Sequence, residues 1–153
     1  MQMDKNYFLE EIDNFISGTM NTYGILFLRY SVGIIFIWFG FLKPLGISPA
    51  QDLVANTVYW FEDKMSFVKF LGWWEVVIGL TMIYKPLIRV SIFLLFIQMP
   101  GTFLPLILLP EVCFTKFPFG LTLEGQYIIK NLIIISSALV IGGTLNSYKI
   151  SRK

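Results

Sequence analysis

Two residues of opposite charge, Arg29 and Glu75, lie inside two of the most apolar stretches of this 153-residue chain. A charge within a membrane span costs on the order of several kcal/mol, so such residues are usually paired and often mark a functional site. The chain has no histidine, and its single cysteine is Cys113. Most zinc, haem and non-haem iron sites therefore lose their usual ligands, and neither an internal disulfide nor CxxC chemistry is possible. We expect no metal or haem, and we expect Arg29 and Glu75 to bind a ligand, to lock the packing or to exchange a proton on Glu75.

The composition predicts a membrane protein. Hydrophobic residues make up 56% of the chain and aromatic residues 17%, and the mean hydropathy is +0.69. A soluble domain of this length could not bury so much apolar surface, so membrane lipid is the expected surrounding. The net charge of +2 is small and its basic residues are scattered, which argues against a nucleic-acid partner.

Four stretches are long enough to cross a hydrocarbon core, which takes about 20 residues. They are residues 22–42, 67–84, 87–110 and 127–145. We therefore predict an all-α, polytopic membrane protein: a four-transmembrane-helix bundle occupying residues 22–145, with a tight antiparallel turn at Lys85-Pro86. Residues 1–21 form an amphipathic segment at the membrane surface or, alternatively, a partly ordered tail, and their acidic side chains do not fit a secretory signal. Residues 146–153 form a basic tail.

Four spans place both termini on one side of the membrane. That side collects six lysines and arginines against five on the other, and three of the six lie in the tail directly after the last span. Basic residues beside a span favour the cytoplasmic side, so both termini are expected in the cytoplasm.

The two long loops are predicted to differ. In the first loop, Ser48 is expected to cap a helix that has Pro49 at its first position. This amphipathic helix is expected to lie along the bilayer surface, with Tyr59 and Trp60 at headgroup level. The second loop, residues 111–126, is expected to dip into the interface without regular structure.

Depth along the helices predicts a buried polar layer. At 1.5 Å per residue, Arg29 lies roughly 10 Å and Glu75 roughly 13 Å from the cytoplasmic ends of their helices. Gln98 comes out at roughly 16 Å, and Ser136 and Ser137 at about 12–14 Å. Each helix thus offers a polar group, and we expect an Arg29–Glu75 ion pair joined by Gln98.

Small residues flank both charges. Gly33 and Gly40 follow Arg29 on nearly one stripe, and Gly72 and Gly79 bracket Glu75. Small residues allow two helices to approach closely, which would keep lipid away from an ion pair. The candidate ligand-binding residues are Arg29, Glu75, Gln98, Trp74 and Ser137, and an ion pair that only fixes packing is the alternative.

Two further features lie toward the outer face. Pro100 and Pro105 each remove a helical donor, so the third span is expected to kink, either to form a ligand site or only to pack. A looser polar group can form the rim of an outward-facing pocket, although Lys130 can also snorkel to water without any function. This group comprises Lys43, Glu124, Gln126, Lys130 and Asn131.

Several of these motifs resemble the DoxX-like superfamily, and within it the YkgB/RclC-type branch. They are Leu28-Arg29-Tyr30-Ser31-Val32-Gly33 through Lys43, Ser48-Pro49, Gly72-Trp73-Trp74-Glu75 with Gly79, Gln98-Met99-Pro100-Gly101-Thr102, Gly120 through Tyr127, and Lys130-Asn131. The resemblance covers nearly the whole chain after about Tyr23. It implies a four-helix protein of the bacterial inner membrane, linked to redox or oxidant stress, and it carries no catalytic residue set.

Three functions therefore stay open. The first is a non-catalytic membrane component that binds a quinone, a lipid or a partner subunit in a redox or oxidant-stress system. The second is a small transporter or channel for a polar solute, and the third is a structural membrane subunit. An enzyme acting alone is the least expected, because the chain offers no nucleophile–base constellation and no metal ligand set. A homo-oligomer also stays open.

Overall fold

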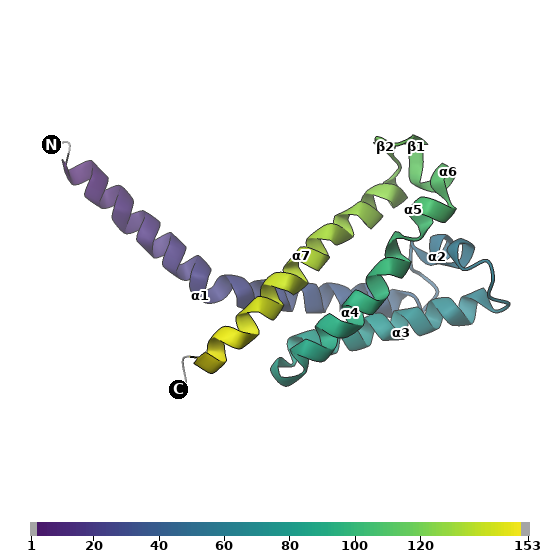
Figure 1. The fold of residues 1–153 in the computed structure, drawn as a ribbon, viewed down its shortest axis with the longest axis horizontal. Coiled ribbons are helices and arrows are strands. Elements are labelled where there is room, and N and C mark those ends of the chain that lie inside the picture. The colour runs from purple at the N-terminus through teal and green to yellow at the C-terminus, as the bar shows by residue number, and fades with distance from the viewer. Residues whose placement is uncertain (1–2, 151–153) are drawn as a thin grey trace.

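The computed structural model describes residues 3–150, and the side chains of residues 8–145. Helices dominate the chain (Figure 1). In order, the elements are α1 (Met3–Leu42), α2 (Gln51–Thr57), α3 (Lys64–Ile83), the 3-10 turn η1 (Lys85–Leu87), α4 (Ile88–Phe103), α5 (Pro105–Leu108), α6 (Pro110–Cys113), β1 (Phe114–Lys116), β2 (Gly120–Leu121) and α7 (Leu123–Ile150).

Among the described residues, four helical segments are long and apolar enough to cross a membrane, which agrees with the predicted number. They are Phe8–Leu42, Lys64–Ile83, Lys85–Leu108 and Leu123–Leu145. We call the end of the bundle at η1 the hairpin end, and the end that carries α2, α5, α6 and the β1–β2 pair the loop end (Figure 1). The predicted turn at Lys85-Pro86 is confirmed, because η1 joins α3 to α4 there and the two helices pack together.

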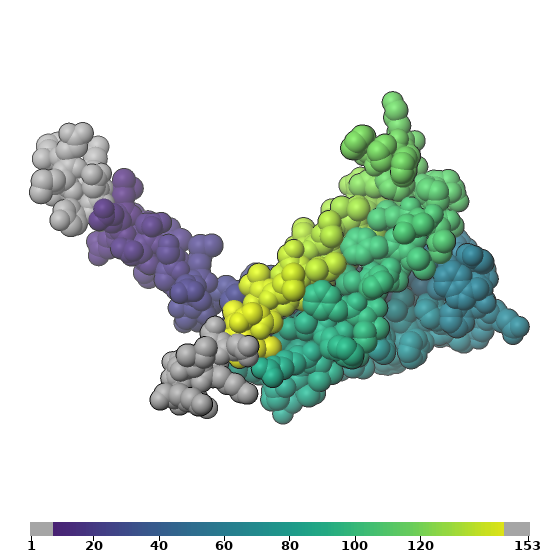
Figure 2. Space-filling model, viewed as in Figure 1, coloured from purple at the N-terminus to yellow at the C-terminus, as the bar shows by residue number. Residues whose placement is uncertain are grey.

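Residues 1–21 were predicted as an amphipathic segment at the membrane surface, and the described part of this segment is helical. From Met3 onward the chain already belongs to α1, which continues for 40 residues to Leu42. The helix bends before it joins the bundle, and its first part projects as an arm (Figures 1 and 2). The hydroxyls of Thr19 and Thr22 donate to the carbonyls four residues earlier, at 2.8 Å each, and such bonds often bend helices.

α1 and α3 pack closely along two glycine pairs. A Cβ added to Gly40 would lie 2.7 Å from the Gly72 carbonyl oxygen, and one added to Gly79 would lie 2.5 Å from the Gly33 carbonyl oxygen. Real Cβ atoms do not come this close, so the two backbones touch only because all four positions lack a side chain. The predicted close approach of these two stripes is confirmed.

α4 and α7 complete the core. Ile78, Met82, Leu95 and Ile141 are almost fully buried where the four long helices meet. The buried Ser91 donates to the Ile78 carbonyl oxygen at 2.7 Å, and this hydrogen bond ties α4 to α3. A buried hydroxyl without such an acceptor would cost free energy, so this bond also satisfies the core.

The two loops differ from the predictions made for them. In the first loop a helix does form, but it begins at Gln51, and its N-cap position is Ala50 without a side-chain cap. Ser48 instead accepts a backbone bond from Gln51 at 3.1 Å, so Ser48-Pro49 forms the preceding turn. The second loop is not irregular: it contains α6 and the antiparallel β1–β2 pair, with a cis peptide bond at Phe117-Pro118.

The predicted kink of the third span is confirmed as a break. Pro100 is accommodated inside α4, whereas Pro105 begins a separate helix, α5. Proline has no backbone N–H to continue the helical ladder, and Leu104 forms a shorter-range bond to the Gly101 carbonyl oxygen at 3.3 Å. The break lies five to seven residues beyond Gln98, toward the loop end.

Replacing Gly79 by leucine tests the α1–α3 contact. The new side chain would meet the Gly33 backbone, so we expect the free energy of unfolding in detergent to fall by about 2 kcal/mol or more. Gly143→Leu is the matched control, because a Cβ at Gly143 has nothing within 4 Å. Equal thermal stability of the two variants would contradict the contact.

Candidate functional site: Lys43, Glu75 and Gln98

Glu75 forms an ion pair with Lys43, not with Arg29. The Lys43 Nζ donates to Glu75 Oε2, and the two side chains are only 7% and 13% exposed. The predicted Arg29–Glu75 pair is therefore wrong. The prediction that Glu75 has a buried cationic partner is right, but the cation is different.

Gln98 completes the cluster from a third helix. Its Nε2 donates to Glu75 Oε1 at 2.8 Å, so both carboxylate oxygens of Glu75 are hydrogen-bonded. Gln98 was predicted to join Glu75, and this is confirmed. The other amide atom, Gln98 Oε1, is buried and has no hydrogen-bond partner.

The register of α1 against α3 explains why Lys43 reaches Glu75. A Cβ on Gly40 would lie 2.8 Å from the Glu75 Cβ, so Glu75 is level with Gly40. Helical side chains lean toward the N-terminus of their own helix. Because α1 and α3 are antiparallel, Glu75 leans toward the loop end while Lys43, one turn beyond Gly40, leans back toward it.

Arg29 lies at the other end of the contact. It precedes Gly40 by eleven residues, roughly 16 Å of helix, and its own lean carries it further away. The predicted depth of Arg29 was measured from residue 22 as the start of the helix. α1 extends well before that residue and meets α3 in a different register, so Arg29 is not level with Glu75. Arg29 is instead near the hairpin end, since the next turn of α1, at Gly33, packs against Ile83.

The remaining candidate ligand-binding residues do not join the cluster through a hydrogen bond. Ser137 is buried and donates to the Ile133 carbonyl oxygen at 2.7 Å, and Ser136 donates to Leu132 at 2.9 Å. These bonds stay within α7, so the expected contribution of a serine to the polar layer is not seen. Trp74 is half-buried and packs against the apolar core.

The predicted outer rim is not one group either. Lys43 is buried with Glu75, whereas Glu124, Gln126 and Lys130 are exposed near the start of α7. Lys130 Nζ lies 5.3 Å from the centre of the Tyr127 ring. Asn131 donates from Nδ2 to the Tyr127 and Ile128 carbonyl oxygens at 3.1 Å each, so its amide serves its own helix.

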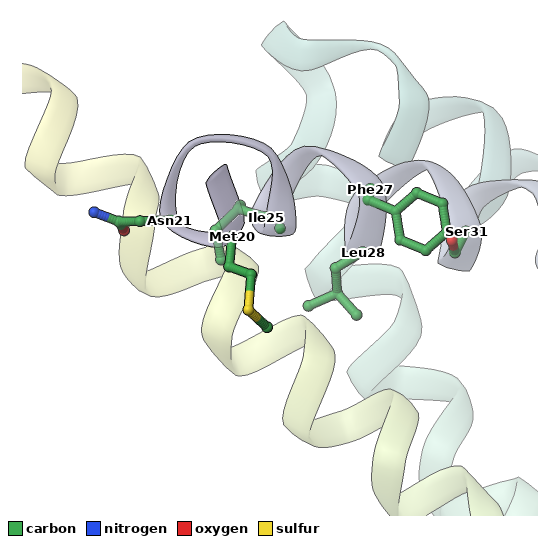
Figure 3. A pocket seen from close by; sticks show the side chains of 7 residues that line it. Met20, Asn21, Ile25, Phe27, Leu28 and Ser31 are labelled. Carbon is green, nitrogen blue, oxygen red and sulfur yellow. The ribbon is translucent and has the colours of Figure 1, made fainter. Parts of the chain in front are cut away.

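A separate hollow of about 430 Å³ lies at the bend of α1 (Figure 3). Its wall is formed by α1 alone and is mostly apolar, with Asn21 and Ser31 as polar members. Neither Glu75 nor Arg29 lines it. It is therefore distinct from the Lys43–Glu75–Gln98 cluster.

The cluster offers a charge pair and one unused acceptor, but no metal site. Within the described residues, no group of three or more histidine, cysteine, aspartate or glutamate side chains is placed to hold a metal ion. Burying an ion pair costs desolvation energy, which hydrogen bonds to the remaining polar atoms help to offset. The Gln98 amide supplies such a bond to Glu75 and leaves its own carbonyl oxygen for a donor.

The signal for Lys43 was present in the sequence. The spacing of seven residues is the same in Gly33–Gly40 and Gly72–Gly79, so pairing the stripes antiparallel sets Gly40 beside Gly72. That register, together with the lean of helical side chains, favours Lys43 over Arg29 as the partner of Glu75. Ser91, the buried bridge between α3 and α4, gave no comparable signal.

Together, fold and site define a predominantly α-helical protein whose described residues include four apolar helices and a buried charge pair. No family model, curated protein or solved structure matches the chain.

Removing one partner of the buried pair should cost more than removing both. Glu75→Met leaves Lys43 buried without a counter-charge, so we expect a loss of about 3–5 kcal/mol in the free energy of unfolding. The double variant Lys43→Met, Glu75→Met should recover most of that loss, as measured by unfolding in detergent. Arg29→Met combined with Glu75→Met should show no such recovery, and recovery there would contradict the pairing.

Cys113 should react only when the protein unfolds. Its side chain is fully buried, and burial, with Glu124 and Glu111 nearby, raises the pKa of its thiol. Because the thiolate is the reactive form, both effects slow alkylation at neutral pH. We expect maleimide labelling at pH 7 to be slow in the native protein and fast in denaturant. Fast native labelling would contradict the packing of α6 on α7.

Proposed function

We propose that this chain is a non-catalytic membrane component that binds a hydrogen-bonding lipid-soluble ligand, with a quinone as the leading candidate, beside Lys43, Glu75 and Gln98. The observation that carries the proposal is the buried, unpartnered Gln98 Oε1 next to a paired carboxylate. Buried acceptors are nearly always satisfied, so an open one next to a charge pair supports a bound donor.

The chemistry of the cluster suits such a ligand. Gln98 Oε1 can accept a hydrogen bond from a quinol hydroxyl, and the Lys43 ammonium has three N–H groups, one of which is used by Glu75. A quinone carbonyl can accept from another. A lipid headgroup or a polar group of a partner subunit would use the same donors and acceptor.

A backbone break lies near the cluster, on its loop-end side. The break between α4 and α5 lies in the same helix as Gln98, on its loop-end side. Irregular backbone at membrane depth is tolerated only against protein or a cavity. We place this end of the bundle at the outer face, with α2 along the interface, Tyr59 and Trp60 in the headgroups, and both termini in the cytoplasm.

The wider assignment follows the sequence resemblance. A DoxX-like, YkgB/RclC-type protein of the bacterial inner membrane, working in a redox or oxidant-stress system, accommodates a quinone-binding role. The transporter or channel and the structural subunit remain the alternatives, and the experiment below separates them.

Gln98→Leu should remove the open acceptor and the amide donor while keeping side-chain size. We expect the protein purified from its native membrane to carry less lipid-soluble material with a quinone spectrum, by about tenfold, since a hydrogen bond in a buried site is worth about 1.5 kcal/mol. Gln126→Leu is the control, because Gln126 is exposed on α7.

The outcomes distinguish the three functions. No quinone in the wild-type protein, with an empty and tightly packed cluster in a high-resolution map, would overturn the proposal in favour of a structural subunit. Leak of a polar solute from vesicles that contain only this protein would favour a transporter or channel.

A further inference from the structure

Arg29 is a buried cation for which the described residues provide no anion. Arg29 is only 9% exposed, and its Nε–H is buried without an acceptor. The guanidinium carbon lies 5.0 Å from the centre of the Tyr30 ring, which is a weak partner for a full charge. Within the described residues its only carboxylate candidate in the bundle interior, Glu75, is taken by Lys43.

Arg29 lies near the hairpin end of the bundle rather than in its middle. Gly33, one turn later in α1, packs against Ile83, the last residue of α3. Arg29 is therefore level with the end of α3 and the start of η1. The carbonyl end of a helix attracts a cation, which helps to hold Arg29 there but gives its Nε–H no acceptor.

The hairpin end carries two further basic residues. Lys85 lies in η1 and Arg89 in the first turn of α4, at the same end as Arg29. Acidic residues of the described chain lie elsewhere. They are on the projecting arm (Asp4, Glu10, Glu11 and Asp13), at the loop end (Asp52, Glu62, Asp63, Glu111 and Glu124) and in the buried pair (Glu75). Asp13 is the nearest of these along α1, roughly 24 Å of helix from Arg29.

A hollow of about 420 Å³ also lies at this end. It is lined by Arg89, Ile92, Gly142 and Leu145, where α4 passes α7. Among the described lining residues, Arg89 is charged and the other three are apolar or small.

We propose that Arg29 binds a phosphate group at the hairpin end, supplied by the headgroup of an anionic phospholipid. A guanidinium presents its N–H groups as a planar fork that matches phosphate oxygens, and a phosphate would satisfy the open Nε–H. Lys85 and Arg89 are basic residues at the same end of the bundle. The site is separate from the Lys43–Glu75–Gln98 cluster and does not depend on the proposed function.

The test measures lipid binding to the purified full-length protein in detergent. Short-chain phosphatidylglycerol is titrated into wild type, Arg29→Gln, Arg29→Lys and the control Lys130→Gln. We expect Arg29→Gln to weaken binding about tenfold, because a charge-assisted hydrogen bond is lost. Arg29→Lys should retain part of the affinity, and Lys130→Gln, which changes an exposed cation at the loop end, should retain all of it.

Two further arms identify the source of the phosphate. Phosphatidylcholine should bind more weakly than phosphatidylglycerol, and inorganic phosphate should compete only at far higher concentration. Equal competition by inorganic phosphate would overturn the lipid assignment in favour of a soluble anion.

Unchanged phosphatidylglycerol affinity in a folded Arg29→Gln variant would overturn the site itself. If that variant does not fold, Arg29→Lys is compared with wild type instead, and an unchanged affinity would overturn the site. Equal affinity of the wild type for phosphatidylglycerol and phosphatidylcholine would also contradict the proposal.

Discussion

The contact between α1 and α3 determines where the buried charges among the described residues lie. Four glycines let the two backbones touch, and this contact fixes one register between the helices. In that register Glu75 is level with Gly40 and within reach of Lys43, while Arg29 is carried to the hairpin end. A shift of one helical turn would separate Lys43 from Glu75 and leave two buried charges without partners, which is strongly unfavourable.

The arrangement divides the bundle into two polar regions with different character. Toward the loop end, Lys43 and Glu75 neutralise each other and Gln98 adds an amide, so the region is polar with no net charge. At the hairpin end, the described residues include the basic side chains of Arg29, Lys85 and Arg89. The first region is the proposed site of a neutral ligand that exchanges hydrogen bonds, and the second is the proposed site of a phospholipid phosphate.

Much of the fold could be predicted from the sequence, because hydropathy and length identify helices that can cross a membrane. The four helices, the turn at Lys85-Pro86 and the break near Pro105 follow from such local signals. The β1–β2 pair and the start of α2 do not follow from local signals. Two such short strands, and a helix N-terminus without a side-chain cap, depend on what packs around them. The continuity of α1 through residue 22 was missed because a change from polar to apolar residues does not end a helix.

The site was predicted in part for a similar reason. Glu75 and Gln98 were identified because a polar residue in an apolar helix is conspicuous wherever it points. The partner of Glu75 was assigned from depth alone, and depth ignores the direction in which helical side chains lean. Lys43 was assigned to the outer rim since it follows the first span, although its long side chain returns into the bundle.

The register of α1 against α3 can be tested by measuring the distance from Glu75 to its cation in a lipid bilayer. Solid-state NMR with ¹⁵N-labelled lysine and arginine and ¹³C-labelled glutamate can detect dipolar coupling to the Glu75 carboxyl carbon. The structure predicts a strong coupling to Lys43 Nζ, which disappears in Lys43→Met, and none to Arg29. A coupling between Glu75 and the Arg29 guanidinium, or none between Glu75 and Lys43, would contradict this register of α1 against α3.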